Sequence, residues 1–356
     1  MSYDSNSKNS VVSPQTGVLA FPASMSQEAF YYLERLRSEA APYNIPVRFQ
    51  LLGEVHLDIM KRAFSAIIER HESLRTQFEE EDGELLQIVL PAVELPLEVI
   101  DISHLSGEEQ TLELTRIGSH EAQKSFRMSI APLLRVVVVR LSASEHILHV
   151  TIHHTVADGW SIGILIEEFT AFYDAILHER PTSLPLLPIQ YADFSAWQRE
   201  FLASPEMHKQ LTYWKEQLQN HSEVDIPADH VRPVVKLWHG DIVSELLPTE
   251  LTDKLKEIAR KNGATLFHVF LSAFKILLSR YTGSTEITLG TPIAGRNRAE
   301  LEPLIGTFIN SLLLRTRFSE DSDFHQLLQQ VRDTVLGAMA NQDLPFECLV
   351  RELKPE

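Results

Sequence analysis

The sequence is poor in cysteine: Cys348 is the only one among 356 residues. A single thiol cannot build a disulfide framework, a CxxC zinc site or an iron–sulfur cluster. Glycine is scarce as well, at 14 residues, and neither G-x-G-x-x-G nor G-x-x-x-x-G-K-[ST] occurs. The dinucleotide-binding and P-loop enzyme classes therefore lose their main support.

Positive charge is also in short supply. The chain has 32 Lys and Arg against 49 Asp and Glu, a formal net charge of −17. Nucleic-acid grooves and anionic membrane surfaces are bound by clustered Lys and Arg, so this balance argues against both partners. No apolar run approaches the roughly 18 residues of a membrane span, and the polar N-terminus lacks the apolar core of a secretory signal. We therefore expect a cytoplasmic protein.

The composition is that of a folded chain, with 44% hydrophobic and 23% charged residues. At roughly 100–200 residues per domain, the length predicts two domains. Residues 1–17 are predicted to be a flexible leader. Pro181, Pro185 and Pro188 indicate a break, so we expect one domain over residues 18–180 and another over residues 181–356.

Strands and helices are predicted throughout both domains. Period-two alternation and short apolar runs predict strands on both sides of Asp82-Gly83 and over residues 47–52, 133–141, 146–154, 242–247, 286–291 and 311–318. Helical spacing of apolar residues predicts helices over residues 24–36, 56–74, 106–126, 161–177, 194–202, 207–218, 250–262, 265–281 and 323–340. This mixture predicts the α/β (α+β) class.

The strand predicted to end at His154 carries the first sign of chemistry. Alternation places Leu148, Val150, Ile152 and His154 on one face, and His153 on the other. A histidine that ends an apolar strip beside a turn is placed to accept a proton near pH 7, because its ordinary pKa is about 6.5. From periodicity alone, a satisfied core histidine is the commoner alternative, and Asp158 before Gly159 is most often a turn residue. With no nearby cysteine or third spaced ligand, a metal site is not expected.

The full string around this histidine, IHHTVADGWS over residues 152–161, resembles the HHxxxDG signature of condensation domains of nonribosomal peptide synthetases. Further segments resemble motifs of that family in the same order. They are RHESLRTQF (70–78), YADFSAW (191–197), GTPIAGR (290–296), IGTFINSLLLR (305–315) and NQDLPFE (341–347). HxxxD alone also marks other acyltransferases, which lack most of these strings.

The resemblance implies two chloramphenicol-acetyltransferase-like lobes that form a V, the second apparently incomplete, with a tunnel between them. Two thioesters enter from opposite ends on the phosphopantetheine arms of donor and acceptor carrier proteins, and the acceptor amine attacks the donor carbonyl. The domain binds no cofactor itself, and neighbouring synthetase domains such as adenylation domains are expected partners.

The resemblance also implies site residues. His154 accepts the ammonium proton or orients the amine, and His153 packs within the fold. Asp158 pairs with an arginine, Arg75 as first choice and Arg296 as second. Gly159 allows close approach and offers its amide to the oxyanion. Three supporting positions are Trp160 and Ser161, which pack and cap the next helix, and Asn310, which lines the tunnel or packs in the core.

Two departures from the family pattern stand out. Ala29 occupies the position of an arginine in the family's first motif, and the chain ends at Glu356, soon after NQDLPFE, as a C-terminally truncated domain would. The strings DGWS and YNIP favour the subtype that accepts an L-configured donor, and the initial Met favours a starter domain that accepts a fatty acyl group. NQDLPFE is expected to be structural, with Pro345 ending the preceding helix.

Two other functions remain open at this point. One is a non-catalytic, condensation-like platform that binds carrier proteins. The other is an acyltransferase of the same fold that uses a soluble acyl-CoA.

Overall fold

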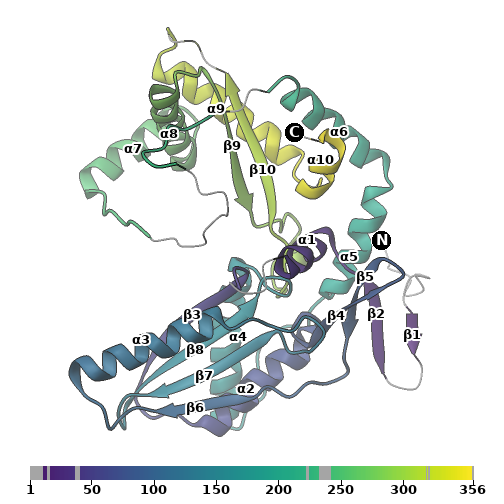
Figure 1. Ribbon diagram of the computed structural model, residues 1–356, viewed down its shortest axis with the longest axis vertical. Helices are drawn as coiled ribbons and strands as arrows, with labels where there is room; N and C mark the ends of the chain where they lie inside the picture. Colours follow the sequence, from purple (N-terminus) through teal and green to yellow (C-terminus); the bar gives the residue numbers. More distant parts are fainter. Residues whose placement is uncertain are drawn as a thin grey trace. The chain divides into compact units, whose positions relative to one another are not determined.

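Figure 1 presents the computed structural model, which describes residues 11–13, 17–36, 41–221, 224–231, 242–317, 319 and 321–354. The chain forms two compact units. Unit 1 comprises Met1–Ala203 and Arg296–Ile309, and unit 2 comprises Ser204–Gly295 and Asn310–Glu356.

The contact-based units divide the chain differently from the predicted domains. The predicted break at residues 180/181 falls inside unit 1, because the following helix α5 (Tyr191–Leu202) buries Tyr191 and Phe194 against Leu304 and Phe308. Of the predicted leader, Val11–Ser13 forms strand β1 and Gly17 lies in a turn, while the other residues lie outside the described ranges.

The central sheet of unit 1 has the order β3-β8-β7-β6. Its strands are β3 (Asn44–Leu52), β6 (Leu97–Asp101), β7 (Leu134–Arg140) and β8 (Glu145–His153). Strand β8 pairs antiparallel with β3 and β7 on its two sides, and β6 pairs parallel with β7. The sequence did not predict β6, whose half-exposed residues lack a continuous apolar face.

Helices cover both faces of this sheet (Figure 1). Helices α2 (Leu57–Arg70) and α4 (Gly159–Leu177) pack on the face that carries Leu148, Val150 and Ile152. Helix α3 (Gly107–Gln123) packs on the opposite face, where Ile117 meets Val137 and Val139. Strand β8 is therefore buried on both faces, and the predicted alternation sets which helix each side chain meets.

The helix predicted over residues 56–74 is two elements. Helix α2 ends at Arg70, His71 is extended with φ −108° and ψ 108°, and the 3-10 helix η1 (Glu72–Arg75) follows. The prediction of one helix was wrong because the His71 ring is buried and bonded to Glu168, 2.9 Å away, which holds the backbone out of helical geometry.

A smaller sheet with the order β1-β2-β5-β4 completes unit 1. Its strands after β1 are β2 (Val18–Pro22), β4 (Thr76–Glu81) and β5 (Glu84–Val89). The predicted hairpin turn at Asp82-Gly83 is confirmed, since both residues have positive φ angles, 51° and 82°. Helix α1 (Met25–Arg35) starts from Ser24, whose hydroxyl accepts the N–H of Gln27 in a capping box.

Unit 2 is built around the antiparallel pair of strands β9 (Glu286–Ile293) and β10 (Asn310–Arg317). Its helices are α6 (Pro205–Leu218), α7 (Thr249–Lys261), α8 (Leu266–Thr282), α9 (Phe324–Ala340) and α10 (Phe346–Leu353). The buried Lys275 of α8 donates from Nζ to the carbonyl oxygens of Ile287, 2.9 Å away, and Leu314, 2.5 Å away. This amino group ties the helix to both strands.

Two predictions in unit 2 were wrong. Residues 242–247 form no strand: Ile242, Val243 and Leu246 are at least 87% exposed, so no sheet face covers their apolar side chains. Pro345 stands at the start of α10, five residues after α9 ends, where its fixed φ suits a helix N-terminus. A 3-10 turn, η2 (Ala299–Leu301), lies in the part of unit 1 that follows β9.

Within the described ranges, no individual helix has the length and apolar character to span a bilayer. Only the bent pair of α7 and α8, at 102° to one another, reaches that length and composition together.

Candidate active site

The end of strand β8 presents the two adjacent histidines of the HHxxxDG string. The backbone N–H of His153 donates to the Leu133 carbonyl at 3.0 Å, and that of His154 donates to the Tyr43 carbonyl at 2.9 Å. The strand end is thus bonded on both sides. The two rings point to opposite faces, as period-two alternation predicts.

His154 is half-buried, and its ring stacks on the ring of Phe30 from α1, with centroids 4.3 Å apart and planes 17° apart. Burial lowers the pKa of His154 below its ordinary value of 6.5, while the nearby Asp158 carboxylate acts in the opposite direction. The lowered pKa favours the neutral imidazole at pH 7. A neutral ring has a lone pair with which to accept a proton, so the ring has the form that a general base requires.

His153 is fully buried on the other face. Its Nδ1 lies 2.8 Å from the Thr155 hydroxyl and accepts the Thr155 backbone N–H at 3.2 Å. The edge of its ring meets Phe126, with centroids 6.0 Å apart. These contacts agree with the prediction that His153 packs and bonds within the fold.

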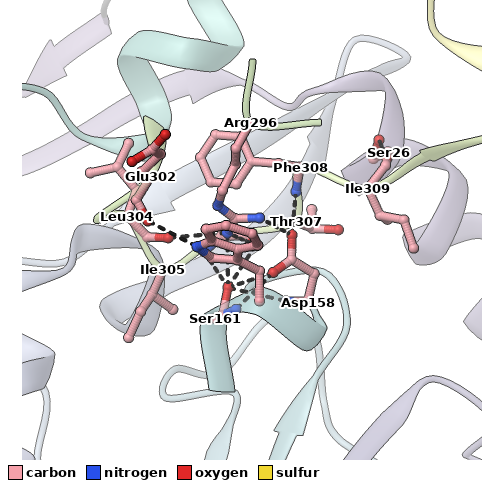
Figure 2. Close-up of polar contacts among 12 residues, drawn as sticks. Ser26, Asp158, Ser161, Arg296, Glu302, Leu304, Ile305, Thr307, Phe308 and Ile309 are labelled. Atoms are coloured by element: carbon pink, nitrogen blue, oxygen red, sulfur yellow. Dashed lines mark hydrogen bonds and ion pairs between the residues drawn. The ribbon is translucent and has the colours of Figure 1, made fainter. Parts of the chain in front are cut away.

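Asp158 is the N-cap of α4, and four donors surround its carboxylate (Figure 2). Oδ1 accepts the backbone N–H of Ser161 at 3.0 Å and its hydroxyl at 2.8 Å. Oδ2 accepts from Nη1 of Arg296 at 2.7 Å and from the backbone N–H of Phe308 at 3.0 Å. The carboxylate is only 4% exposed, so it is structural: it anchors residues 296–309 to the start of α4.

Arg296 is the partner that the structure selects. Besides Asp158, its Nη2 donates to the Leu304 carbonyl at 3.1 Å, and its guanidinium lies 4.3 Å from the Phe308 ring centroid. The first-choice partner, Arg75, was wrong: it lies in η1 and donates to the Leu90 carbonyl and to Glu72. Sequence distance carried no information here, because the chain returns to unit 1 only at residue 296.

Ser161 and Trp160 take the supporting positions expected of them. The Ser161 hydroxyl also accepts the Gly306 backbone N–H at 3.2 Å and so completes the capping box of α4. The Trp160 indole N–H donates to the Glu302 carbonyl at 3.0 Å, although its ring is 49% exposed (Figure 2). Both residues therefore bind the returning segment to the helix that begins at the motif.

Gly159 is exposed at the first position of α4, and an added Cβ would meet no atom within 4 Å. Its surroundings in unit 1 do not require a glycine, so the expected close approach has no counterpart among the described residues. Its amide is one of the first in the helix, which have no intrahelical acceptor. That amide is available to bind a developing negative charge.

Asn310 lies at the start of β10 in unit 2, where its side chain bonds to the backbone of the NQDLPFE segment. Its amide nitrogen donates to the carbonyls of Gln342 at 2.9 Å and Leu344 at 2.8 Å, and its oxygen accepts the N–H of Phe346 at 3.0 Å. These bonds place Asn310 and the segment in structural roles.

The sequence reasoning missed Phe30 and Glu34, which face the two histidines from α1. The available signal was their spacing of four residues on a predicted helix, which puts both side chains on one face. Nothing in the sequence indicated that this face meets β8. Among the described residues, no group of three His, Cys, Asp or Glu side chains is placed to hold a metal ion.

The model of the family described as Condensation domain matches residues 20–356 of this sequence. The chain belongs to the condensation-domain family. The sequence resemblance to this family is thereby confirmed, and with it the class of amide-forming acyltransferase to which condensation domains belong.

Two curated relatives are large synthetases. One of the linear gramicidin synthase proteins of Brevibacillus parabrevis is 43% identical over 94% of this chain, and one of the plipastatin synthase proteins of Bacillus subtilis (strain 168) is 40% identical over 94%. The chain spans 6% of the first relative and 13% of the second.

Solved condensation-domain structures share the fold. The X-domain in complex with OxyB from teicoplanin biosynthesis superposes with a TM-score of 0.85 at 25% identity, covering 100% of this chain and 77% of that one. The first condensation domain of the calcium-dependent antibiotic synthetase gives 0.77 at 20% identity, covering 93% and 77%. The predicted mixed α/β fold of the chloramphenicol-acetyltransferase type is therefore confirmed.

Proposed function

We propose that the chain joins a carrier-bound acyl or peptidyl thioester to a carrier-bound aminoacyl thioester, with His154 as the group that receives the ammonium proton. The observation that carries the proposal is the half-buried His154 ring, whose lowered pKa keeps it neutral, at the end of a strand that is bonded on both sides. The substrates arrive on phosphopantetheine arms, and the domain itself holds no cofactor.

The chemistry asks modest help of the protein. A free α-amine has a pKa near 8, and a thioester is already activated. The amine nitrogen attacks the donor carbonyl, a C–N bond forms, and the C–S bond then breaks. The proton released by the amine passes through His154 to the leaving thiolate, and the Gly159 amide donates to the oxyanion of the tetrahedral intermediate.

For the donor, we propose an L-configured residue, as the DGWS and YNIP strings favour, with a fatty acyl starter as the alternative. The proposed architecture is a V of two lobes, with the tunnel passing His154. Donor and acceptor carriers, and adenylation domains of the same synthetase, are the proposed partners. The relatedness to gramicidin and plipastatin synthases supports this setting.

The test loads two carrier proteins with a defined acyl group and a defined amino acid and measures the amide product by intact mass. His154→Ala is expected to lower the rate by about 10²–10⁴-fold if the ring is a general base. His178→Ala, which removes an exposed histidine at the far end of α4, serves as the matched control and is expected to retain the rate. A second arm offers the same acyl group on soluble CoA.

The outcomes separate the alternatives. If His154→Ala forms product as fast as the unaltered chain, the catalytic assignment fails and a carrier-binding platform is favoured. The solved X-domain in complex with OxyB supports that alternative, since a protein of this fold there binds a second protein. Product from acyl-CoA at the rate of the carrier substrate would support the soluble acyltransferase instead.

A further inference from the structure

Helix α1 contacts both histidines of the motif from a single face. The Phe30 ring stacks on His154, and one turn later the Glu34 carboxyl group lies 3.8 Å from Nε2 of His153. Residues four apart on a helix are neighbours, whereas adjacent residues on a strand point to opposite faces. The helix therefore crosses the end of β8 and meets a ring on each side of it.

The tautomer of His153 follows from its neighbours. The backbone N–H of Thr155 donates to Nδ1 at 3.2 Å, so Nδ1 presents a lone pair. In a neutral imidazole the proton is then on Nε2, the nitrogen that faces Glu34. The Nε2–H group and the Glu34 carboxyl group form a donor and an acceptor in ion-pair range.

This pair is buried, and no other described group bonds to it. The side chain of His153 is 0% exposed and that of Glu34 is 6% exposed. Both Glu34 carboxyl oxygens and His153 Nε2 lack a hydrogen-bond partner among the described residues. At 3.8 Å the gap exceeds a direct N–H···O bond of about 3 Å, so a shift of under about 1 Å or one bridging water completes the contact.

A carboxyl group is an expensive choice for this position. A buried acceptor without a partner costs about 1–3 kcal/mol, and an apolar residue of similar volume is often neutral or stabilising. The local fold therefore gives no reason to prefer Glu34 over leucine. A requirement on the orientation of the histidine rings does.

We propose that Glu34 is a positioning residue for the condensation reaction. It holds the Nε2–H of His153, which fixes the last residue of β8, and the peptide bond and the Phe30 stack transmit this placement to His154. The inference rests on the proposed function, because its kinetic consequence is read from amide formation.

The test compares Glu34→Leu, Glu34→Gln and the control Arg35→Gln, in which an exposed neighbour on the same helix is changed. NMR of histidine-labelled protein is expected to show a downfield, slowly exchanging Nε2–H of His153 in the unaltered chain, in the control and in Glu34→Gln, whose amide oxygen still accepts. Glu34→Leu is expected to lose that signal and to keep or raise its melting temperature. Its kcat for amide formation is expected to fall by up to about 100-fold, the effect of a misplacement near 1 Å, with KM for the carriers unchanged.

The NMR and kinetic arms fail separately. A proton on Nδ1 of His153 in the unaltered chain, or an Nε2–H signal that Glu34→Leu leaves in place, overturns the inference. So does a Glu34→Leu variant that makes amide at full rate. A lower melting temperature in Glu34→Leu would mean that Glu34 supports the fold instead. If the unaltered chain makes no amide at all, the proposed function fails, while the NMR signal still decides whether Glu34 holds His153.

Discussion

The ion pair between Asp158 and Arg296 gives the sharpest stability prediction, because it joins residues 138 positions apart within unit 1. Replacing Arg296 with leucine leaves the Asp158 carboxylate buried, with the Ser161 N–H, the Ser161 hydroxyl and the Phe308 N–H as its remaining donors. Removing one partner of a buried pair costs about 3–5 kcal/mol. Since three neutral donors remain, we expect a loss near the lower limit, about 3 kcal/mol.

The assay is urea unfolding combined with hydrogen exchange of peptides that cover residues 296–309. Arg296→Leu should lower the free energy of unfolding and accelerate exchange at the Phe308 amide, which Asp158 holds. A double-mutant cycle with Asp158→Asn should give a coupling energy in the range of about 0.5–3 kcal/mol, as expected for residues of one network.

The matched control is Arg35→Leu, which breaks the exposed pair between Arg35 and Glu80 at a similar separation of 2.8 Å. Surface pairs contribute about 0–1 kcal/mol, so the control should change little. An Arg296→Leu variant no less stable than Arg35→Leu, with unchanged exchange in 296–309, would refute the claim that Asp158 anchors this segment.

Two further predictions concern packing and pH. An alanine Cβ at Gly306 would lie 2.1 Å from Cδ2 of Tyr191, so Gly306→Ala should cost about 1–3 kcal/mol by overpacking in thermal or urea unfolding. Gly163→Ala, in the open middle of α4, should instead gain up to about 1 kcal/mol; equal effects of the two changes would contradict the packing described. Burial lowers the pKa of His149 and His154 in the folded state, so the unfolded chain binds their protons more readily. Stability should therefore be complete above about pH 6.5 and decline as the pH falls toward the folded-state values. The urea midpoint measured between about pH 7.5 and 5.5 should fall accordingly, and less steeply in His149→Gln; a midpoint that rises on acidification would show the sign to be wrong.

Short-range patterns in the sequence predicted much of the fold. The alternation in β8 correctly separated His154 from His153, and the apolar spacing of Met60, Phe64, Ile67 and Ile68 correctly gave the buried face of α2. The family motif also predicted that Asp158 would bind an arginine. These features depend on neighbours within a turn of helix or along one strand, or on a short string of residues, which a sequence displays directly.

Contacts between distant segments were beyond local patterns. The choice of Arg296 over Arg75 depends on the return of the chain to unit 1 after β9, and the roles of Phe30 and Glu34 depend on how α1 crosses β8. Residues 242–247 show the converse error. Their apolar run is typical of a strand, but a strand needs a partner, and these side chains are exposed.

The return of residues 296–309 to unit 1 has a practical consequence for dissecting the protein. The polypeptide passes between the units at three points, after residues 203, 295 and 309. A cut near residue 204 would remove the guanidinium that neutralises Asp158 and the carbonyl of Ile305 that receives the Ser73 hydroxyl. A minimal fragment bearing the histidine motif must therefore be spliced from two stretches of the gene, with a short designed bridge from residue 203 to residue 296.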